Sequence, residues 1–172
     1  MLKFILISIM FLICTFIGFY LGEKYRQRTL NLKEMQKALM ILNSEILYAN
    51  TPLPEALLDI SKKVSDPISK ILAKTSKNLE LGEVLSVNDA FDDAFNTYKE
   101  EVALTKDDYK LISDFFKSIG ECGIVGQERI FKLALEGLNI NYLEANSEAK
   151  TNIKIYRALG ASIGAMMGIF FI

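Results

Sequence analysis

The fold is decided by residues 45–57, which read Glu45-Ile46-Leu47-Tyr48-Ala49-Asn50-Thr51-Pro52-Leu53-Pro54-Glu55-Ala56-Leu57. Pro52 ends the helix before it, because proline lacks a backbone N–H and disfavours helical geometry in the preceding residue. Pro54 can occupy the first turn of a second helix, where the missing N–H costs nothing. The stretch therefore predicts the corner of a helical hairpin. The apolar residues of the first helix recur every three or four positions, as one helix face requires; they are Met35, Leu39, Leu42 and Ile46.

Four further helical segments are predicted after the corner, each with its own start or stop signal. The signals are Asp66-Pro67 and Gly82 around a third helix, Ser86 before a fourth, Thr105 with Asp108 before a fifth, and Gly120, Gly123 and Gly126 before a sixth that begins at about Gln127. No segment shows the alternation typical of a half-buried strand. The predicted fold is all-α, an antiparallel six-helix bundle with short loops.

Both ends of the chain are strongly apolar. Phe4–Gly22 carries no charged residue, and a helix of that length can cross the hydrocarbon core of a bilayer. The C-terminal run is shorter, but glycines recur at every fourth position in both ends, and such strips let membrane helices approach closely. The sequence therefore predicts transmembrane helices on both sides of the bundle. The glycines expected to pack these helices are Gly18, Gly22, Gly160, Gly164 and Gly168.

The expected division of the chain is residues 1–23 as a first membrane helix, 24–156 as the bundle and 157–172 as a glycine-rich second membrane helix. A cleaved signal peptide fits the first segment poorly, because only Lys3 precedes a long apolar run and no Ala-x-Ala site follows. A buried C-terminal helix of a soluble core is the alternative for the last segment. Basic residues just after the first span place the bundle in the cytoplasm.

The composition argues against an enzyme and against a protein that binds nucleic acid. The formal net charge of −1 does not suit a protein that coats nucleic acid. There is no histidine, the usual general base, and two cysteines alone cannot form a zinc site. Asp89, Asp92 and Asp93 could indicate a cation cluster, although carboxylates early in a helix also favour its positive end. The sequence predicts no catalytic residue, no cofactor and no metal site.

Glu45 and Tyr48 lie on the last turns before the corner. On an ordinary helix they would be a solvated charge and a half-buried aromatic ring. Beside a corner set by prolines, they could either hold the hairpin together or contact a partner protein. Both interpretations stay open at this point.

The corner also carries a resemblance to a known family. Glu45, Ile46 and Tyr48, followed by Thr51-Pro52-Leu53, resemble the stage III sporulation protein AB family, which is itself similar to the type II secretion inner-membrane platform protein. Tyr156-Arg157-Ala158-Leu159-Gly160 matches a second stretch of that family. The loop at Gly120–Gln127 departs from it, because apolar residues and a glycine stand where polar residues are usual.

This resemblance implies a non-enzymatic platform in a secretion-like channel complex between mother cell and forespore. The implied partners are the cytoplasmic ATPase of the stage III complex and its other subunits, with a homo-oligomer also possible. The implied location is the cell membrane on the mother-cell side, that is the outer forespore membrane, with the bundle facing the cytoplasm. The alternative is a membrane-anchored signalling or regulatory adapter whose bundle binds a protein unrelated to secretion.

Overall fold

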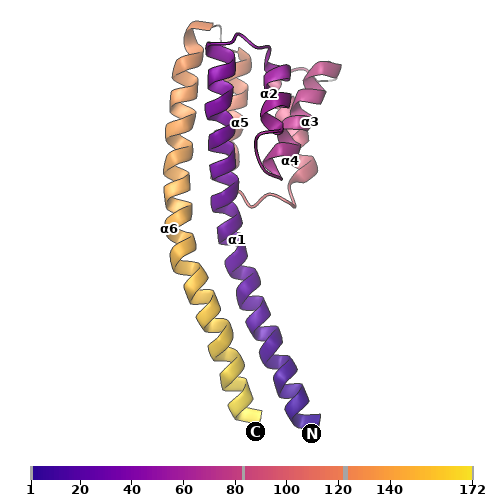
Figure 1. Cartoon of the computed structure of the whole chain (residues 1–172), viewed down its shortest axis with the longest axis vertical. Coiled ribbons are helices and arrows are strands. Elements are labelled where there is room, and N and C mark those ends of the chain that lie inside the picture. Colours follow the sequence, from indigo (N-terminus) through magenta and orange to yellow (C-terminus); the bar gives the residue numbers. More distant parts are fainter. Residues whose placement is uncertain (1, 83, 122–123, 172) are drawn as a thin grey trace. The chain divides into compact units, whose positions relative to one another are not determined.

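The computed structural model describes residues 2–82, 84–121 and 124–171, and among them it has six helices and no strand (Figure 1). The expected all-α, six-helix fold is confirmed. The helices are α1 (Leu2–Leu47), α2 (Leu53–Ser61), α3 (Ile68–Leu81), α4 (Val87–Tyr98), α5 (Lys106–Glu121) and α6 (Ile124–Phe171).

The two terminal helices differ from the expectation of separate membrane and bundle elements. α1 is one continuous helix of 46 residues and α6 one of 48. The segment after Gly22 stays helical because it is rich in residues of good helix propensity. Arg26 and Gln27 also donate hydrogen bonds to Glu23, at 2.9 and 2.8 Å, and such pairs on one helix face support the helix.

The chain divides into two compact units. Unit 1 comprises Met1–Thr29 and Glu144–Ile172, and unit 2 comprises Leu30–Leu143. The expected boundaries after residues 23 and 156 both fall inside unit 1. Within unit 1 the two chain termini lie at the same end (Figure 1). Among the described residues, no helix has an apolar stretch long enough to cross a membrane, so this finding does not support the flanking transmembrane helices.

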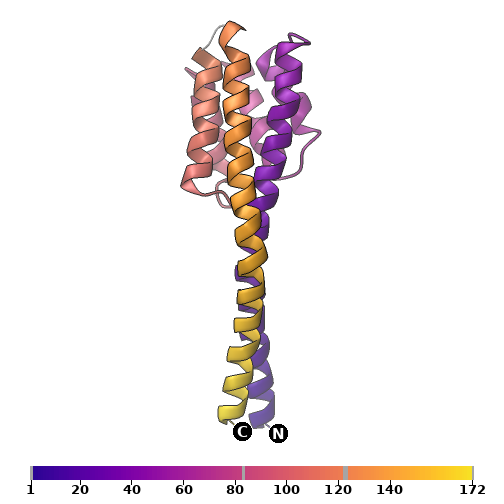
Figure 2. The ribbon, with the colours of Figure 1, turned by 90° about the vertical axis from the view of Figure 1, so that its left-hand side faces the viewer.

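Unit 2 has a core of aliphatic and aromatic side chains. Its segments of α1, α5 and α6 run alongside one another, with α2, α3 and α4 packed against them (Figures 1 and 2). Phe91 of α4 stacks on Phe116 of α5 with ring centroids 4.4 Å apart, and Phe115 lies 5.1 Å from Phe131 of α6. The predicted apolar face of the first helix is largely confirmed as buried: Met35, Leu39 and Leu42 are buried, and Ile46 is half-buried. The other helices of unit 2 also bury apolar side chains, which include Ala56, Leu57, Ile60, Ile68, Ile71, Leu72, Ala90, Ala94, Phe95, Ile112 and Ile119.

The predicted start and stop signals are confirmed at three helix ends. Gly82 follows α3 with φ of 64°, the left-handed conformation that glycine adopts without a steric cost. The side chain of Ser86 accepts a hydrogen bond from Asp89 N, 3.1 Å away, and so caps α4. Thr105 and Asp108 exchange hydrogen bonds between side chain and backbone N–H, at 3.2 and 3.0 Å. This reciprocal pair is a capping box, and it sets the start of α5.

Candidate functional site

The corner between α1 and α2 is a tight, locally hydrogen-bonded turn. Asn50 has φ of 52°, a conformation that asparagine tolerates better than most residues. Thr51 N donates a hydrogen bond to the carbonyl oxygen of Glu45, 3.1 Å away. Pro52 then precedes the first residue of α2, and its carbonyl accepts a hydrogen bond from Ala56 N. The chain therefore turns where the two prolines predict it.

The carboxylate of Glu45 joins both ends of α2 to the end of α1. Its Oε2 accepts a hydrogen bond from Thr51 Oγ1 at 3.2 Å, just before α2 begins. Its Oε1 lies 3.7 Å from Lys63 Nζ, just after α2 ends. Two further contacts strengthen the second tie, since Lys37 donates to the carbonyl of Lys63 and Glu34 accepts from Ser65 N. Of the two open interpretations of Glu45, these contacts favour the structural one.

Tyr48 is placed differently. Its side chain is 82% exposed, and Pro52 beside it is also exposed, whereas Ile46, Thr51 and Leu53 are partly covered. A large aromatic ring exposed on a rigid turn does not hold the hairpin together. The structure therefore distinguishes two residues for which the sequence left the same two interpretations open. Glu45 stabilises the corner through its contacts, whereas the side chain of Tyr48 is exposed on it.

Replacing Glu45 with alanine should lower the free energy of unfolding by about 1 kcal/mol, because a partly buried hydrogen bond to Thr51 is lost. The ion pair with Lys63 should add little, since an exposed lysine is well screened by solvent. Glu45→Gln keeps an acceptor for Thr51 and should recover most of the loss. Chemical denaturation of the two variants checks this; equal losses would mean that the charge, not the hydrogen bond, matters.

Of the three carboxylates of α4 that could have formed a cation cluster, those of Asp92 and Asp93 are engaged within the chain, and Asp89 contributes its backbone N–H to the cap of the helix. Asp93 pairs with Lys74 at 3.0 Å and accepts from Asn78, and the Lys74 and Asn78 contacts hold its pKa below the usual range. Asp92 accepts a hydrogen bond from the Tyr109 hydroxyl at 2.8 Å. Among the described residues, no group of three or more acidic or cysteine side chains is arranged to hold a metal ion.

A polar cluster between α4 and α5 was not predicted from the sequence. Besides Tyr109, Asp92 accepts hydrogen bonds from Asn88 and Ser113, at 2.8 and 3.3 Å. Ser113 also donates to the side-chain oxygen of Asn88. Burial, together with the neighbouring Asp92, raises the pKa of the Tyr109 hydroxyl. Asn88 and Asp92 of α4 are far in sequence from Tyr109 and Ser113 of α5 and share no motif with them, so only packing of α4 on α5 brings the two pairs together.

A second feature that the sequence did not predict is a hydrogen bond between a capping residue of α5 and a residue of α6. Asp108 is fully buried. While one of its carboxylate oxygens caps α5, the other accepts a hydrogen bond from Asn141 Nδ2 of α6, 2.9 Å away. The capping motif predicts the first contact, but no local signal predicts the second. Asp108 therefore connects the start of α5 to α6.

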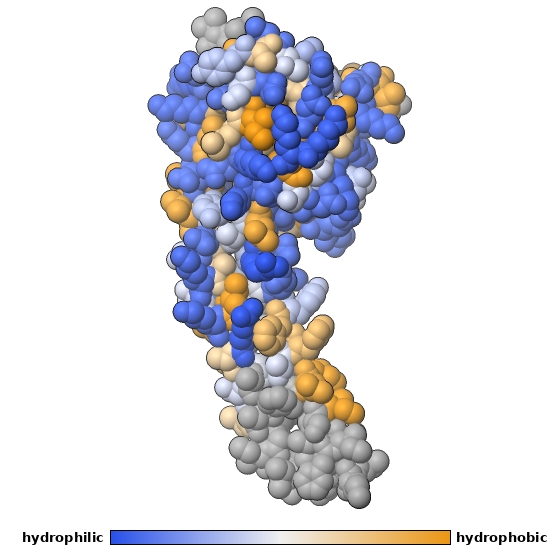
Figure 3. Space-filling model, viewed as in Figure 1, coloured by the Kyte–Doolittle hydropathy of each residue, from blue (hydrophilic) through white to orange (hydrophobic). Residues whose placement is uncertain are grey.

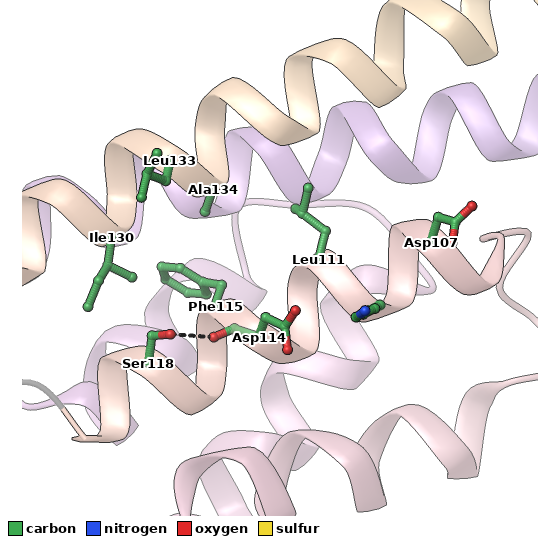
Figure 4. Close-up of a pocket in the computed structure, with 9 residues that line it drawn as sticks. Asp107, Leu111, Asp114, Phe115, Ser118, Ile130, Leu133 and Ala134 are labelled. Carbon is green, nitrogen blue, oxygen red and sulfur yellow. Dashed lines mark hydrogen bonds between the residues drawn. The ribbon is translucent and has the colours of Figure 1, made fainter.

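The described part of unit 2 includes two surface hollows lined by α5 and its neighbours. One, of about 380 Å³, lies between α5 and α6; we call it the α5–α6 groove (Figure 4). Its lining residues are Asp107, Lys110, Leu111, Asp114, Phe115, Ser118, Ile130, Leu133 and Ala134. The other, of about 620 Å³, lies between the segment after α3 and the end of α5, where Gly120 lies. The rest of the glycine-rich loop is only partly described, and residues 122–123 lie outside the described residues.

In unit 1 the expected glycine face of α1 meets α6. A Cβ on Gly18 would lie 2.6 Å from the carbonyl oxygen of Tyr156 and 3.2 Å from the Cα of Gly160. Only glycine allows this approach of two backbones. Gly22 lies against Ile153 instead, at ordinary van der Waals distance. Gly164 and Gly168, the other two glycines expected there, lie outside the residues whose surroundings are described.

The described surface of unit 1 carries many exposed apolar side chains together with charged ones such as Lys24, Arg26 and Lys154. Hydrophobic residues gather there, whereas the visible face of unit 2 is mostly hydrophilic (Figure 3). Exposed members are Leu12, Ile13, Phe16, Ile17, Leu159, Ile163 and Met166. Basic and aromatic side chains meet near residue 20: the guanidinium of Arg157 lies 4.8 Å from the ring centre of Phe19, and Lys24 lies 5.8 Å from that of Tyr20.

Comparison with known proteins identifies the family. The profile of the family described as "Stage III sporulation protein AB (spore_III_AB)" matches residues 3–172. The chain belongs to this family. Stage III sporulation protein AB of Bacillus subtilis (strain 168) is 27% identical over 153 residues, which cover 89% of each chain. A solved structure titled "Stage III sporulation protein AB" is similar with a TM-score of 0.66 and 26% identity, over 72% of this chain and 96% of that one.

The two stretches that suggested the stage III sporulation protein AB family occupy distinct places in the structure. The first, from Glu45 to Leu53, is the corner of unit 2. The second, Tyr156 to Gly160, supplies the backbone that Gly18 approaches in unit 1. Tyr156 also stacks on Tyr25, with ring centroids 5.8 Å apart. In this family member, both stretches therefore coincide with points where two helices are joined.

Proposed function

We propose that this member of the stage III sporulation protein AB family is a non-enzymatic platform in a secretion-like channel between mother cell and forespore. Membership of the family supports a role in sporulation. In the proposed role, unit 1 anchors the protein in the mother-cell membrane. Unit 2 faces the cytoplasm and docks the ATPase of the stage III complex.

The observation that carries the docking proposal is the exposure of Tyr48 on a fastened corner. Tyrosine is among the residues that contribute most to protein–protein binding, because its large ring has few rotatable bonds. The contacts of Glu45 fix the turn before any partner arrives. A partner would therefore not have to order this part of the chain, which lowers the entropic cost of binding.

The membrane proposal rests on the sequence and on unit 1. Phe4–Gly22 is free of charge, and the exposed side chains of unit 1 are mostly large and apolar. Contiguous apolar surface of this kind marks contact with lipid or with another protein. Basic and aromatic residues such as Arg157 and Phe19 are typical of the region where a membrane helix meets water.

Tyr48→Ala should weaken binding of the cytoplasmic ATPase by about tenfold or more, as loss of a central aromatic anchor does. The experiment titrates the ATPase into the full-length protein, reconstituted in lipid nanodiscs, and measures the heat of binding. Unfolding of the variant should match that of the wild type, because the side chain of Tyr48 is 82% exposed and buries little apolar surface. Leu85→Ala is the matched control, since Leu85 is also an exposed large apolar residue but belongs to the segment between α3 and α4 and not to the corner.

Equal affinities of Tyr48→Ala and the wild type would remove the corner as the docking site. If the wild-type protein binds no ATPase at all, the platform proposal fails in its present form. The adapter interpretation, in which unit 2 binds a protein unrelated to secretion, would then be the better one.

A further inference from the structure

The α5–α6 groove and its rim have a composition that suits a second copy of the same chain. Its floor is apolar: Leu111 and Phe115 of α5 point toward Ile130, Leu133 and Ala134 of α6 (Figure 4). Leu133 is 58% exposed. Farther along α6, Ile140 is 65% exposed. This apolar strip continues the groove along unit 2. Covering it with a partner is favourable, because apolar surface is then removed from water.

The strip can extend along both helices because they approach closely. A Cβ on Gly137 of α6 would lie 2.3 Å from a methyl carbon of Leu111. Because Gly137 has no side chain, Leu111 can lie directly against the backbone of α6. Gly137 stands between Leu133 and Ile140 in the sequence. The result is a shallow surface rather than a deep pocket, and helix faces dock on surfaces of this kind by packing ridges into grooves.

Charged residues on the exposed side of α5 alternate in sign. They are Lys106, Asp107, Lys110, Asp114, Lys117 and Glu121, of which the four from Asp107 to Lys117 concern the groove and its rim. All four are exposed, and none forms an ion pair among the residues that the structure describes. Elsewhere in unit 2 several lysines are paired, for example Lys62 with Asp59 and Lys70 with Glu101. The charges of α5 are therefore available to an outside partner.

The order of these charges is self-complementary. If two α5 helices pack antiparallel about a two-fold axis at residue 112, Lys110 comes to the same height as Asp114 of the second copy. Asp107 then comes to the height of Lys117 of the second copy. With a helical rise of about 1.5 Å per residue, these levels lie about 3 and 7.5 Å from the axis. Every level pairs opposite charges, and the two-fold symmetry makes each pair occur twice.

We propose that the α5–α6 groove is the interface through which two copies of this protein form a symmetric dimer. Leu111, Leu133 and Ile140 supply apolar area, and the alternating charges of α5 set the antiparallel register. A basic or acidic partner would meet like charges at half of these positions. A second copy meets only opposite ones. This inference goes beyond the proposed docking of an ATPase and does not depend on it.

A charge exchange across the two-fold axis tests the interface. Lys110→Glu places two carboxylates together at each Lys110–Asp114 level, and Asp114→Lys places two ammonium groups there. Each single variant should raise the dissociation constant of the dimer by about tenfold or more, since two attractive pairs become repulsive. The double variant, Lys110→Glu with Asp114→Lys, restores opposite charges and should return the constant to near the wild-type value.

The measurement is sedimentation equilibrium of the full-length protein in density-matched detergent, over a wide range of protein concentrations. Lys77→Glu is the matched control: Lys77 is exposed on α3 and makes no ion pair among the described residues, so dimerisation should be unaffected. Helix content by circular dichroism shows that every variant is folded. High salt should weaken the wild-type dimer, because exposed charges are screened.

A wild-type protein that stays monomeric at every concentration overturns the proposal. So does a dimer that tolerates both single variants, since its interface must then lie elsewhere. Loss of the dimer in the single variants without recovery in the double variant overturns the antiparallel register.

Discussion

Replacing Phe116 with alanine is expected to lower the free energy of unfolding of unit 2 by about 3–5 kcal/mol, the usual cost of removing a fully buried aromatic ring. Phe116 is fully buried, stacks on Phe91 at 4.4 Å and meets Phe115 edge-on at 5.3 Å. Its loss would leave a cavity where α4 packs on α5. Since small domains are stable by only about 5–15 kcal/mol in total, the variant should be close to unfolding.

Hydrogen exchange of the full-length protein measures this effect, because the slowest backbone amides of α4 and α5 report the stability of unit 2. Phe116→Leu is the control. It keeps most of the apolar volume and should cost roughly 1–2 kcal/mol. A loss below about 1 kcal/mol for the alanine variant would show that neighbouring side chains fill the space, against the tight packing described here.

Asp108→Ala is expected to cost about 2–4 kcal/mol, because it removes a helix cap and leaves two donors of part-buried hydrogen bonds without their acceptor. Thr105 N and Asn141 Nδ2 both donate to this carboxylate, at 3.0 and 2.9 Å. The effect should exceed that of an ordinary surface cap, because Asp108 is fully buried. The same hydrogen-exchange measurement gives the free energy.

A double-mutant cycle with Asn141→Ala separates the two contacts. If Asp108 and Asn141 stabilise unit 2 through their mutual hydrogen bond, the double variant should lose less than the sum of the single losses, by about 1 kcal/mol or more. Losses that add within about 0.5 kcal/mol would mean that the two residues act independently. Asp108 would then stabilise only the start of α5.

The two proposed surfaces of unit 2 use different kinds of side chain. At the corner, a single exposed ring is presented by a turn that Glu45 fastens. At the α5–α6 groove, a row of exposed charges flanks an apolar strip. A variant at one surface should leave the other unaffected, since effects of distant, independent sites are usually additive. Tyr48→Ala should therefore form dimers normally, and the Lys110 and Asp114 variants should bind the ATPase normally.

Most of the helix limits in unit 2 could be predicted because their signals are local. Pro52 and Pro54 end one helix and start the next, Gly82 ends α3, and Ser86 starts α4. Each signal acts on backbone groups within a few residues. The continuity of α1 past Gly22 could not be predicted in this way. The expected membrane segment suggested a boundary there, whereas the residues that follow favour a helix and no local signal ends it.

The sequence by itself determined the all-α class, the corner, the caps and the buried helix faces, because these follow from periodicity and short-range hydrogen bonding. Only the tertiary structure decided which distant residues meet. It showed that the second carboxylate oxygen of Asp108 accepts a hydrogen bond from Asn141 and that Asp92 accepts one from Tyr109. It also showed that Glu45 makes contacts within the corner while Tyr48 is exposed. The physical reason is that such contacts depend on the register in which helices pack. One pattern of apolar residues is compatible with several ways of packing a helix on its neighbours. The fit between side chains of adjacent helices determines which of these contacts form.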